Sequence, residues 1–393
     1  MKIKSLVIDG IAGIQHLELC FVDGINVICG VNGIGKTTIL DVVSDAFNAD
    51  VSGKLKRNAM SKVGKYVVEI ETETDNGLSV DRKEVIIDAF QPDTNFYHGT
   101  WQKYAEKCLS FGIDRDIHYI KLDHIAPDPK RGSYISGKMA VDGISSDDIK
   151  SWFVNRYLFL GKEGSLSQTQ IANFKFAEKM FGILDNTVTF KSVIGSSFDI
   201  MLSTDRGEIY FEYLSAGYKS CIYIILGIIK EIEYRFTETP IYVQDFDGVI
   251  LIDEIELHLH PTWQAELVRV LKLIFPKTQF IMTTHSPSVL QSLEKDEIIA
   301  LGKDHTGKTV LKELNLGRFG LQGWTLEEIM KYVMEMPETT TMLYQKTLER
   351  FDDAMNREEG DVILEQYHLL KEMLHPDNPL CRLLSIQIAE WEE

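Results

Sequence analysis

Three features are absent or scarce in this sequence of 393 residues. Its five cysteines are scattered and form no C-x-x-C pair, which argues against a disulfide framework or a zinc knuckle. No apolar run approaches the roughly 18 residues that a membrane span requires, and the first residues lack the apolar segment of a signal peptide. We therefore expect a cytoplasmic protein with no membrane contact.

Basic residues are also scarce. The formal net charge is −18, and the acidic excess is strong from residue 321 onward. Such a surface repels nucleic acid at long range. Nucleic-acid binding would therefore need either a local basic patch or a partner protein. The best candidate for a basic patch consists of Lys54, Lys56, Arg57, Lys62 and Lys65. The alternative is that these residues form a solvated surface loop.

Residues 30–37 read GVNGIGKT and match the P-loop pattern G-x-x-x-x-G-K-[ST] after an apolar strand-like run. Its glycines allow backbone N–H groups to surround phosphate oxygens at the start of a helix. We expect Lys36 to reach the β- and γ-phosphates of ATP and Thr37 to ligate Mg²⁺. The alternative is a glycine-rich turn. The predicted nucleotide-binding residues are Asn32, Gly33, Ile34, Gly35, Lys36, Thr37 and Thr38.

Residues 249–254 read VILIDE, an apolar run that ends in two carboxylates. This pattern is typical of a buried parallel strand with functional groups at its carboxyl end. Adjacent strand residues point to opposite faces, so we expect separate roles. Asp253 would face the metal, and Glu254 would activate the attacking water. The alternative is a solvent-exposed acidic strand end.

Two further segments point to a family. Residues 214–220, LSAGYKS, resemble the signature loop of ATP-binding-cassette ATPases, and residues 283–286, TTHS, resemble their switch segment. The resemblance implies a homodimer that sandwiches ATP, in which Ser215 and Gly217 serve the partner's site. It also implies that His285 senses the γ-phosphate. A hydrogen-bonded structural histidine is the alternative for His285.

One element that the resemblance implies has no clear match. Cassette ATPases carry a glutamine loop that completes the Mg²⁺ shell. Gln91 is the best candidate, because it follows the hairpin-like stretch 65–88 in a loop-like segment. Its metal role rests on the resemblance alone.

The N-terminal segment and DEIELHLHP at 253–261 resemble the RecF and SMC-related group of cassette ATPases. His258 and His260 suggest a metal pair, but a loop into a helix that starts at Pro261 explains them better. Sustained heptads are missing, which excludes the long SMC arm. The predicted fold is therefore α/β, a P-loop NTPase with a mixed sheet flanked by helices. We expect two ATPase lobes, 1–90 and 187–312, a mixed or helical insertion, 91–186, and an acidic helical tail, 313–393.

Residues after His285 contain no D-x-D pair suited to two-metal nuclease chemistry. A cassette head with a short acidic tail resembles the ATPases of bacterial anti-phage systems, most closely the PtuA-type ATPases of Septu and retron-associated systems. This resemblance implies an ATPase that regulates or scaffolds a separate nuclease of the HNH type. The alternative is a RecF-like repair ATPase, which would bind DNA directly and in a salt-sensitive manner.

Overall fold

A computed structural model describes residues 1–393 except 51–52, 75–76, 96–100, 116, 337–338 and 392–393. The chain divides into two compact units, Met1–Glu335 and Met336–Glu393. The first unit carries all of the motifs described above. The second is a small helical unit with its own core.

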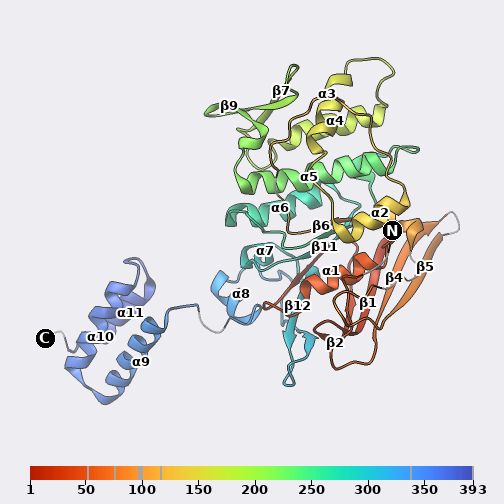
Figure 1. The fold of residues 1–393 in the computed structure, drawn as a ribbon. Helices are drawn as coiled ribbons and strands as arrows, with labels where there is room; N and C mark the ends of the chain where they lie inside the picture. Colours follow the sequence, from red (N-terminus) through yellow and green to blue (C-terminus); the bar gives the residue numbers. More distant parts are fainter. Residues whose placement is uncertain (51–52, 75–76, 96–100, 116, 337–338, 392–393) are drawn as a thin grey trace. The chain divides into compact units, whose positions relative to one another are not determined.

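The first unit is built on a six-stranded sheet with the order β13-β12-β3-β11-β10-β6 (Figure 1). Pairing is parallel from β12 to β6, while β13 is antiparallel to β12. Parallel pairing places the carboxyl ends of β3, β11, β10 and β6 at one edge. The three central strands are buried throughout, as their apolar sequences predict. The strands are β3 Ile25–Cys29, β6 Cys108–Phe111, β10 Val249–Ile252, β11 Gln279–Thr283, β12 Ile298–Lys303 and β13 Thr309–Leu311.

One face of this sheet packs on helix α1, Lys36–Asp45, and beyond it on an antiparallel sheet with the order β2-β1-β4-β5. These strands are β1 Lys2–Ile11, β2 Ile14–Cys20, β4 Gly64–Thr74 and β5 Gly77–Ile87. The expected hairpin of β4 and β5 is present, but residues 75 and 76 of its turn lie outside the described residues. Helix α1 is therefore held between two sheets, which fixes the loop that precedes it.

The other face carries the helical layers (Figure 1). Helix α5, Ala216–Arg235, begins within the signature-like segment 214–220 and is buried along almost all of its length. The other helices of this layer are α3 Ile149–Phe159, α4 Gln168–Met180, α6 Pro261–Ile274 and α7 Pro287–Gln291, while α2 Ser133–Asp142 packs next to α1. A small sheet of β7 Thr189–Ile194, β8 Asp199–Thr204 and β9 Gly207–Tyr210 completes this part. Short 3₁₀ turns are η1 Gln102–Lys107, η2 Phe211–Tyr213, η3 Val243–Asp245 and η4 Lys295–Glu297.

Residues 313–335 pack with the first unit, although the sequence groups them with the tail. Helix α8, Leu326–Tyr332, begins with a capping box between Thr325 and Glu328. Its residue Ile329, with Val333 that follows it, is fully buried in the core of the first unit. The compact second unit therefore begins at Met336, later than position 313.

The second unit contains α9 Met342–Arg357, α10 Gly360–Met373 and α11 Pro379–Gln387. Phe351, Ile363, Tyr367, Leu370 and Ile388 form most of its own small core. Thr341 and Asn378 cap the first and last of these helices, as expected for polar residues before an apolar period. Among helices of the described residues, none combines the length and apolarity that crossing a membrane requires.

Candidate functional site

The loop between β3 and α1 has a backbone that strongly favours glycine at three positions. Gly30, Gly33 and Gly35 have φ values of 143°, 72° and 110°. A Cβ atom at Gly30 would lie 2.5 Å from the carbonyl oxygen of Leu301. Gly35 is the N-cap of α1. The sequence pattern therefore encodes an open loop at the positive end of a helix, which is a ready anion site.

The remaining loop residues hold or line this turn. Ile34 is buried, and its carbonyl oxygen accepts a hydrogen bond from Thr309 Oγ1 at 3.0 Å. Asn32 is exposed, and Thr38 is half-buried in the first turn of α1. Ile34 thus anchors the loop to β13, while Asn32 remains accessible.

Lys36 lies against the loop that precedes it. Its Nζ donates to the carbonyl oxygens of Gly30 at 2.9 Å and Val31 at 3.1 Å. Burial lowers the pKa of Lys36, although Cys29 and the nearby acids Glu256, Asp253 and Glu254 act in the opposite direction. The ammonium group is thus a largely desolvated cation that bonds neutral carbonyl groups.

Thr37 and Asp253 meet at the carboxyl edge of the sheet, although they are far apart in the sequence. The Oγ1 atom of Thr37 lies 3.3 Å and 3.1 Å from Asp253 Oδ1 and Oδ2. Asp253 Oδ1 also accepts from Thr283 Oγ1 at 2.6 Å. Three oxygen-bearing side chains therefore converge, one from the first turn of α1 and two from the neighbouring ends of β10 and β11. Oxygen donors of this kind are the ligands that Mg²⁺ prefers.

The expected alternation of Asp253 and Glu254 along a strand is wrong. Strand β10 ends at Ile252, so both acids lie in the turn beyond it. Glu254 has φ 49°, a left-handed conformation that is uncommon outside glycine. Its N–H donates to Thr283 Oγ1 at 2.7 Å. The directions of the two carboxylates are therefore set by a strained turn and by Thr283, not by strand pleating.

His285 follows β11 and is held by a carboxylate that the sequence analysis did not single out. Glu256 accepts from the backbone N–H of His285 and from Thr284 Oγ1, the latter at 2.7 Å. Burial lowers the pKa of His285, and Lys36 lowers it further. The imidazole is therefore mainly neutral near pH 7. The signal for Glu256 was present as the third acid of the segment DEIE.

The signature segment opens helix α5. Ser215 is the N-cap and its hydroxyl accepts from Tyr218 N at 3.3 Å. Gly217 is buried, and a Cβ atom there would lie 2.6 Å from the carbonyl oxygen of His258. Gly217 therefore allows α5 to pack directly on the turn that follows Glu254. The described residues that line the cleft at Thr37 and Asp253 include neither Ser215 nor Gly217.

His258 and His260 lead into α6, as their sequence context predicts. Helix α6 begins at Pro261, and the His260 ring accepts from Thr262 N at 3.4 Å as the helix cap. His258 has φ 66° and supports the tight turn before the helix. Both residues thus have a structural explanation in the loop between Glu254 and α6.

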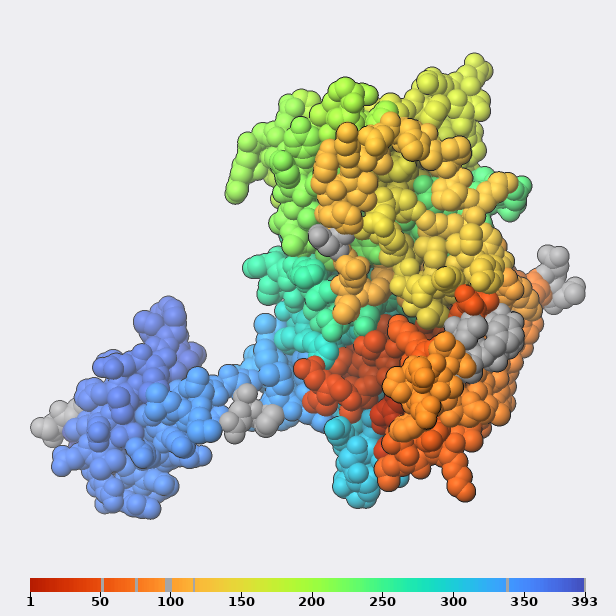
Figure 2. Space-filling view, in the orientation of Figure 1, coloured from red at the N-terminus to blue at the C-terminus, as the bar shows by residue number. Residues whose placement is uncertain are grey.

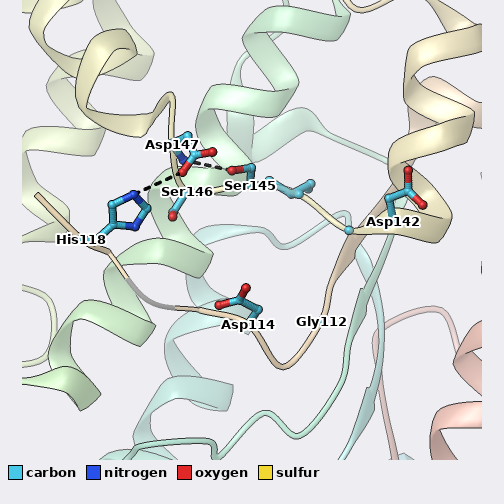
Figure 3. A pocket seen from close by; sticks show the side chains of 9 residues that line it. Gly112, Asp114, His118, Asp142, Ser145, Ser146 and Asp147 are labelled. Atoms are coloured by element: carbon cyan, nitrogen blue, oxygen red, sulfur yellow. Dashed lines mark hydrogen bonds and ion pairs between the residues drawn. The ribbon is translucent and has the colours of Figure 1, made fainter. Parts of the chain in front are cut away.

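The cleft beside Thr37 and Asp253 is continuous with a larger cavity. The two share Gly112, Asp142 and Gly143, and the larger one has a volume of about 500 Å³. Figure 3 shows its side chains, with His118 next to Asp147 at 3.8 Å. In the space-filling view, the red surface around α1 adjoins the yellow surface around α2 (Figure 2). This cleft opens between helix α2 and the carboxyl edge of the six-stranded sheet with the P-loop, which we call the nucleotide edge.

Gln91 lies elsewhere in the described chain. It is exposed in a turn after β5, where its carbonyl oxygen accepts from Thr94 N at 3.2 Å. The segment that reaches the cleft next to Asp253 is instead the one that follows β6, represented by Gly112. The structure therefore does not bring Gln91 to the other candidate site residues.

Arg115 is a site residue that the sequence analysis missed. It is buried, and its guanidinium donates to the carbonyl oxygens of Asp253, Ile255 and Gly112, the last at 2.8 Å. Burial lowers the pKa of Arg115 to about 10. Its sequence signal was weak, because it is a single arginine in an irregular segment. Arg115 ties the turn at Asp253 to the segment after β6.

The candidate basic patch is largely engaged within the chain. Lys54 pairs with Asp41 at 2.6 Å, and Lys56 donates to the Thr94 carbonyl oxygen at 2.5 Å. Arg57 donates to the Ser61 carbonyl oxygen at 2.7 Å. Lys65 lies 4.0 Å from Asp9, while Lys62 is exposed. These contacts favour the reading of a structured surface loop.

Comparisons with known proteins agree with this geometry. Family models match residues 5–177, as an AAA domain, and residues 123–291, as an AAA domain described as a putative AbiEii toxin of a type IV TA system. The Septu protein PtuA of Bacillus thuringiensis is 42% identical over 395 residues, covering 100% of this chain and 98% of the relative. The Retron Ec83 probable ATPase of Escherichia coli is 31% identical over 202 residues, covering 50% of this chain and 35% of the relative.

Among solved structures, an SMC head bound to the C-winged helix domain of ScpA is similar at a TM-score of 0.48 and 15% identity. The matched region covers 80% of this chain and 98% of the SMC head chain. The P-loop, the acidic turn after β10 and the mixed sheet flanked by helices define a P-loop ATPase. The identity over the full length of the Bacillus thuringiensis relative shows that this chain belongs to the Septu PtuA family.

Proposed function

We propose that this ATPase binds ATP with Mg²⁺ between two copies of its first unit and uses hydrolysis to control a separate nuclease in anti-phage defence. The observation that carries the proposal is the meeting of Thr37 and Asp253 at 3.1 Å beside the P-loop. A hydroxyl and a carboxylate in this arrangement suit a metal that bridges to phosphate oxygens.

The residues present fit a magnesium-bound triphosphate. Backbone N–H groups at residues 32–38 offer donors at the start of α1, and Lys36 adds a cation whose hydrogen bonds within the described part of the chain go to carbonyl groups. Phosphate oxygens are stronger acceptors for that ammonium than carbonyl oxygens. Thr37 and Asp253 would hold Mg²⁺, which neutralises developing charge on the phosphates when bound.

Glu254 is proposed as the base that activates the attacking water. Its left-handed backbone is held by Thr283, whose hydroxyl contacts both the Glu254 N–H and Asp253. One hydroxyl thus coordinates the positions of two acids with different roles. His285, kept mainly neutral by burial and by Lys36, can donate a hydrogen bond to the γ-phosphate without adding a charge.

The signature segment is proposed to act on the nucleotide of a second copy. Ser215 lies exposed at the start of α5, where a helix N-terminus favours an anion. Gly217 contributes by its lack of a side chain, because this allows α5 to contact the turn at His258 that follows Glu254. Contact with the partner's γ-phosphate would then be transmitted to the base of the same chain.

The proposed effector is a separate nuclease of the HNH type. Family membership with a Septu protein supports the defence role, and the acidic second unit supports contact through protein instead of nucleic acid. The second unit presents helices with its own core, which suits a docking platform. Gln91 stays a proposed metal-shell residue only if its loop moves toward Asp253 when nucleotide binds.

The test is the variant Glu254→Gln, compared with Lys36→Ala and with Glu313→Gln at an exposed position as the matched control. We expect Glu254→Gln to lower ATP turnover at least a hundredfold, about 2.7 kcal/mol in the barrier, and to retain an ATP-dependent dimer. Lys36→Ala should lose nucleotide binding, and Glu313→Gln should match the wild type. Turnover follows phosphate release, and light scattering with and without ATP follows the mass. Equal turnover in Glu254→Gln and wild type would exclude Glu254 as the base.

A further inference from the structure

A second cavity of the first unit lies away from the nucleotide edge, close to the start of the signature segment. Its volume is about 320 Å³. It borders the end of β9 and the turn η2, which leads directly into Leu214 and Ser215. Its lining residues are Tyr119, Asp199, Tyr210, Glu212 and Tyr213.

The charges at this cavity are unbalanced. Lys150 Nζ lies 2.6 Å from Asp199 Oδ1 and 3.2 Å from Glu212 Oε1. All three side chains are at least nine-tenths buried, so one cation faces two carboxylates. The second oxygen of Glu212, Oε2, is buried and has no hydrogen-bond partner among the described residues. A buried carboxylate oxygen without a donor is costly, which makes this position receptive to a further cation.

The walls of the cavity are aromatic. The Tyr119 ring centroid lies 4.4 Å from Lys150 Nζ, so this ring already faces one cation. Tyr210 and Tyr213 pack at 5.3 Å with an interplanar angle of 65°. Tyr119 is 55% exposed and Tyr213 is 73% exposed, so a large part of each ring stays accessible to a ligand. Tyrosine rings beside a carboxylate attract organic cations by their quadrupole as well as by charge.

We propose that this cavity binds the guanidinium group of an arginine side chain that another protein presents. The net negative charge of the site disfavours an anion, and the two buried carboxylates disfavour a purely apolar group. The described residues contain no cluster of His, Cys, Asp or Glu suited to a metal ion. A planar guanidinium can pair with Glu212 Oε2 and stack on a tyrosine ring at the same time.

Such binding would act on the signature segment. Phe211 is buried in the core and Tyr213 lies on the rim, so η2 links the cavity to Ser215. An arginine seated between Glu212 and Tyr213 would restrain the residues that position the N-cap of α5. Binding of the arginine is inferred from the cavity alone, whereas its effect on the signature segment rests on the proposed function.

The test uses Nα-acetyl-arginine amide as the probe and Nα-acetyl-citrulline amide as its uncharged counterpart, followed by saturation-transfer NMR. We expect the arginine probe to bind the full chain at least tenfold more tightly than the citrulline probe. Glu212→Gln and Tyr213→Ala should each weaken the arginine probe at least fivefold. The matched control is Glu208→Gln, on strand β9 just before η2, where Glu208 pairs with Lys191 and does not line the cavity.

Several outcomes would overturn the proposal. Equal binding of the two probes would do so, as would unchanged affinity in Tyr213→Ala, whose side chain is exposed enough for the variant to fold. Thermal unfolding verifies that Glu212→Gln is folded. Lys36→Ala should bind the arginine probe as tightly as the wild type does. Loss of nucleotide binding and loss of probe binding can therefore be distinguished. If Glu212→Gln alone disrupts ATP-dependent pairing of two copies in the absence of another protein, the arginine comes from a second copy, which contradicts a separate partner.

Discussion

Charged side chains gather in two regions of the first unit, and the kind of partner that these side chains contact differs between the two regions. At the nucleotide edge, Lys36 and Asp253 bond carbonyl and hydroxyl groups that a ligand can replace. Around the C-terminal half of α5, by contrast, buried cations and carboxylates pair directly with one another. Arg156 Nε lies 2.7 Å from Glu233 Oε2, which also accepts from Trp152 Nε1 at 2.9 Å.

The network around α5 continues through Glu231. It pairs with Arg131, with Lys230 at 3.2 Å and with Arg235 at 3.1 Å, and Asp148 joins Arg131 and Lys230. Burial alone would raise the pKa of Glu231, but the three cations hold it below its ordinary value. In Glu233, burial prevails and raises the pKa. These groups fix α3 and the segment near Asp148 to α5.

The difference teaches how one core can support both a ligand site and a rigid frame. A buried ion network of this kind resists change, because removal of one member leaves another charge desolvated and unpaired. The nucleotide edge leaves Lys36 without a carboxylate hydrogen bond among the described contacts, so its charge stays available for phosphate. We expect variants of the network to change stability and variants of the edge to change function.

The largest effect is expected for Arg156→Met, which leaves Glu233 buried without its cation. The free energy of unfolding should fall by about 3–5 kcal/mol, measured by urea denaturation. The paired variant Lys36→Met removes a desolvated ammonium and should leave stability within about 1 kcal/mol of the wild type, while ATP binding is lost. A loss of stability in Lys36→Met as large as that in Arg156→Met would erase the contrast between the regions.

Arg115 offers a sharper comparison, because it is buried like the network but bonds the nucleotide edge. Arg115→Met would free the carbonyl oxygens of Asp253 and Ile255 and loosen the turn that carries Glu254. We expect ATP turnover to fall about tenfold, or about 1.4 kcal/mol in the barrier, with ATP affinity changed less than threefold. Steady-state turnover and nucleotide titration measure the two quantities. Loss of affinity without loss of turnover would place Arg115 in nucleotide binding instead.

The nucleotide edge was predictable from the sequence because its chemistry requires fixed residue types at fixed local spacing. Gly30, Gly35, Lys36 and Thr37 follow one another in one loop, and the acids follow one buried strand. The alternation assigned to Asp253 and Glu254 failed because nothing in VILIDE marks where the strand ends. The left-handed backbone of Glu254 depends on Thr283, which lies on another strand.

The α5 network and Arg115 were not predictable in the same way. Several of these pairs join residues that are distant in sequence, such as Arg156 with Glu233, and single charges within apolar helices carry no pattern of their own. The position expected for Gln91 was not reliable for the same reason. Its loop-like surroundings were recognised, but the sequence alone did not show that the segment after β6 would occupy the position next to β10.

The smallest expected effect concerns the cysteines, which report on local opening in both regions. Burial raises the pKa of the thiols of Cys29, before the P-loop, and Cys108, beside Arg235 of α5, each to about 12. Both should therefore react with iodoacetamide at pH 8 far more slowly than the exposed Cys20. Because nucleotide stabilises only the edge to which it binds, ATP with Mg²⁺ should slow the labelling of Cys29 further, by about threefold, and leave Cys108 unchanged. Peptide mass spectrometry of timed samples measures each rate, and equal slowing at both cysteines would show that the two regions open together.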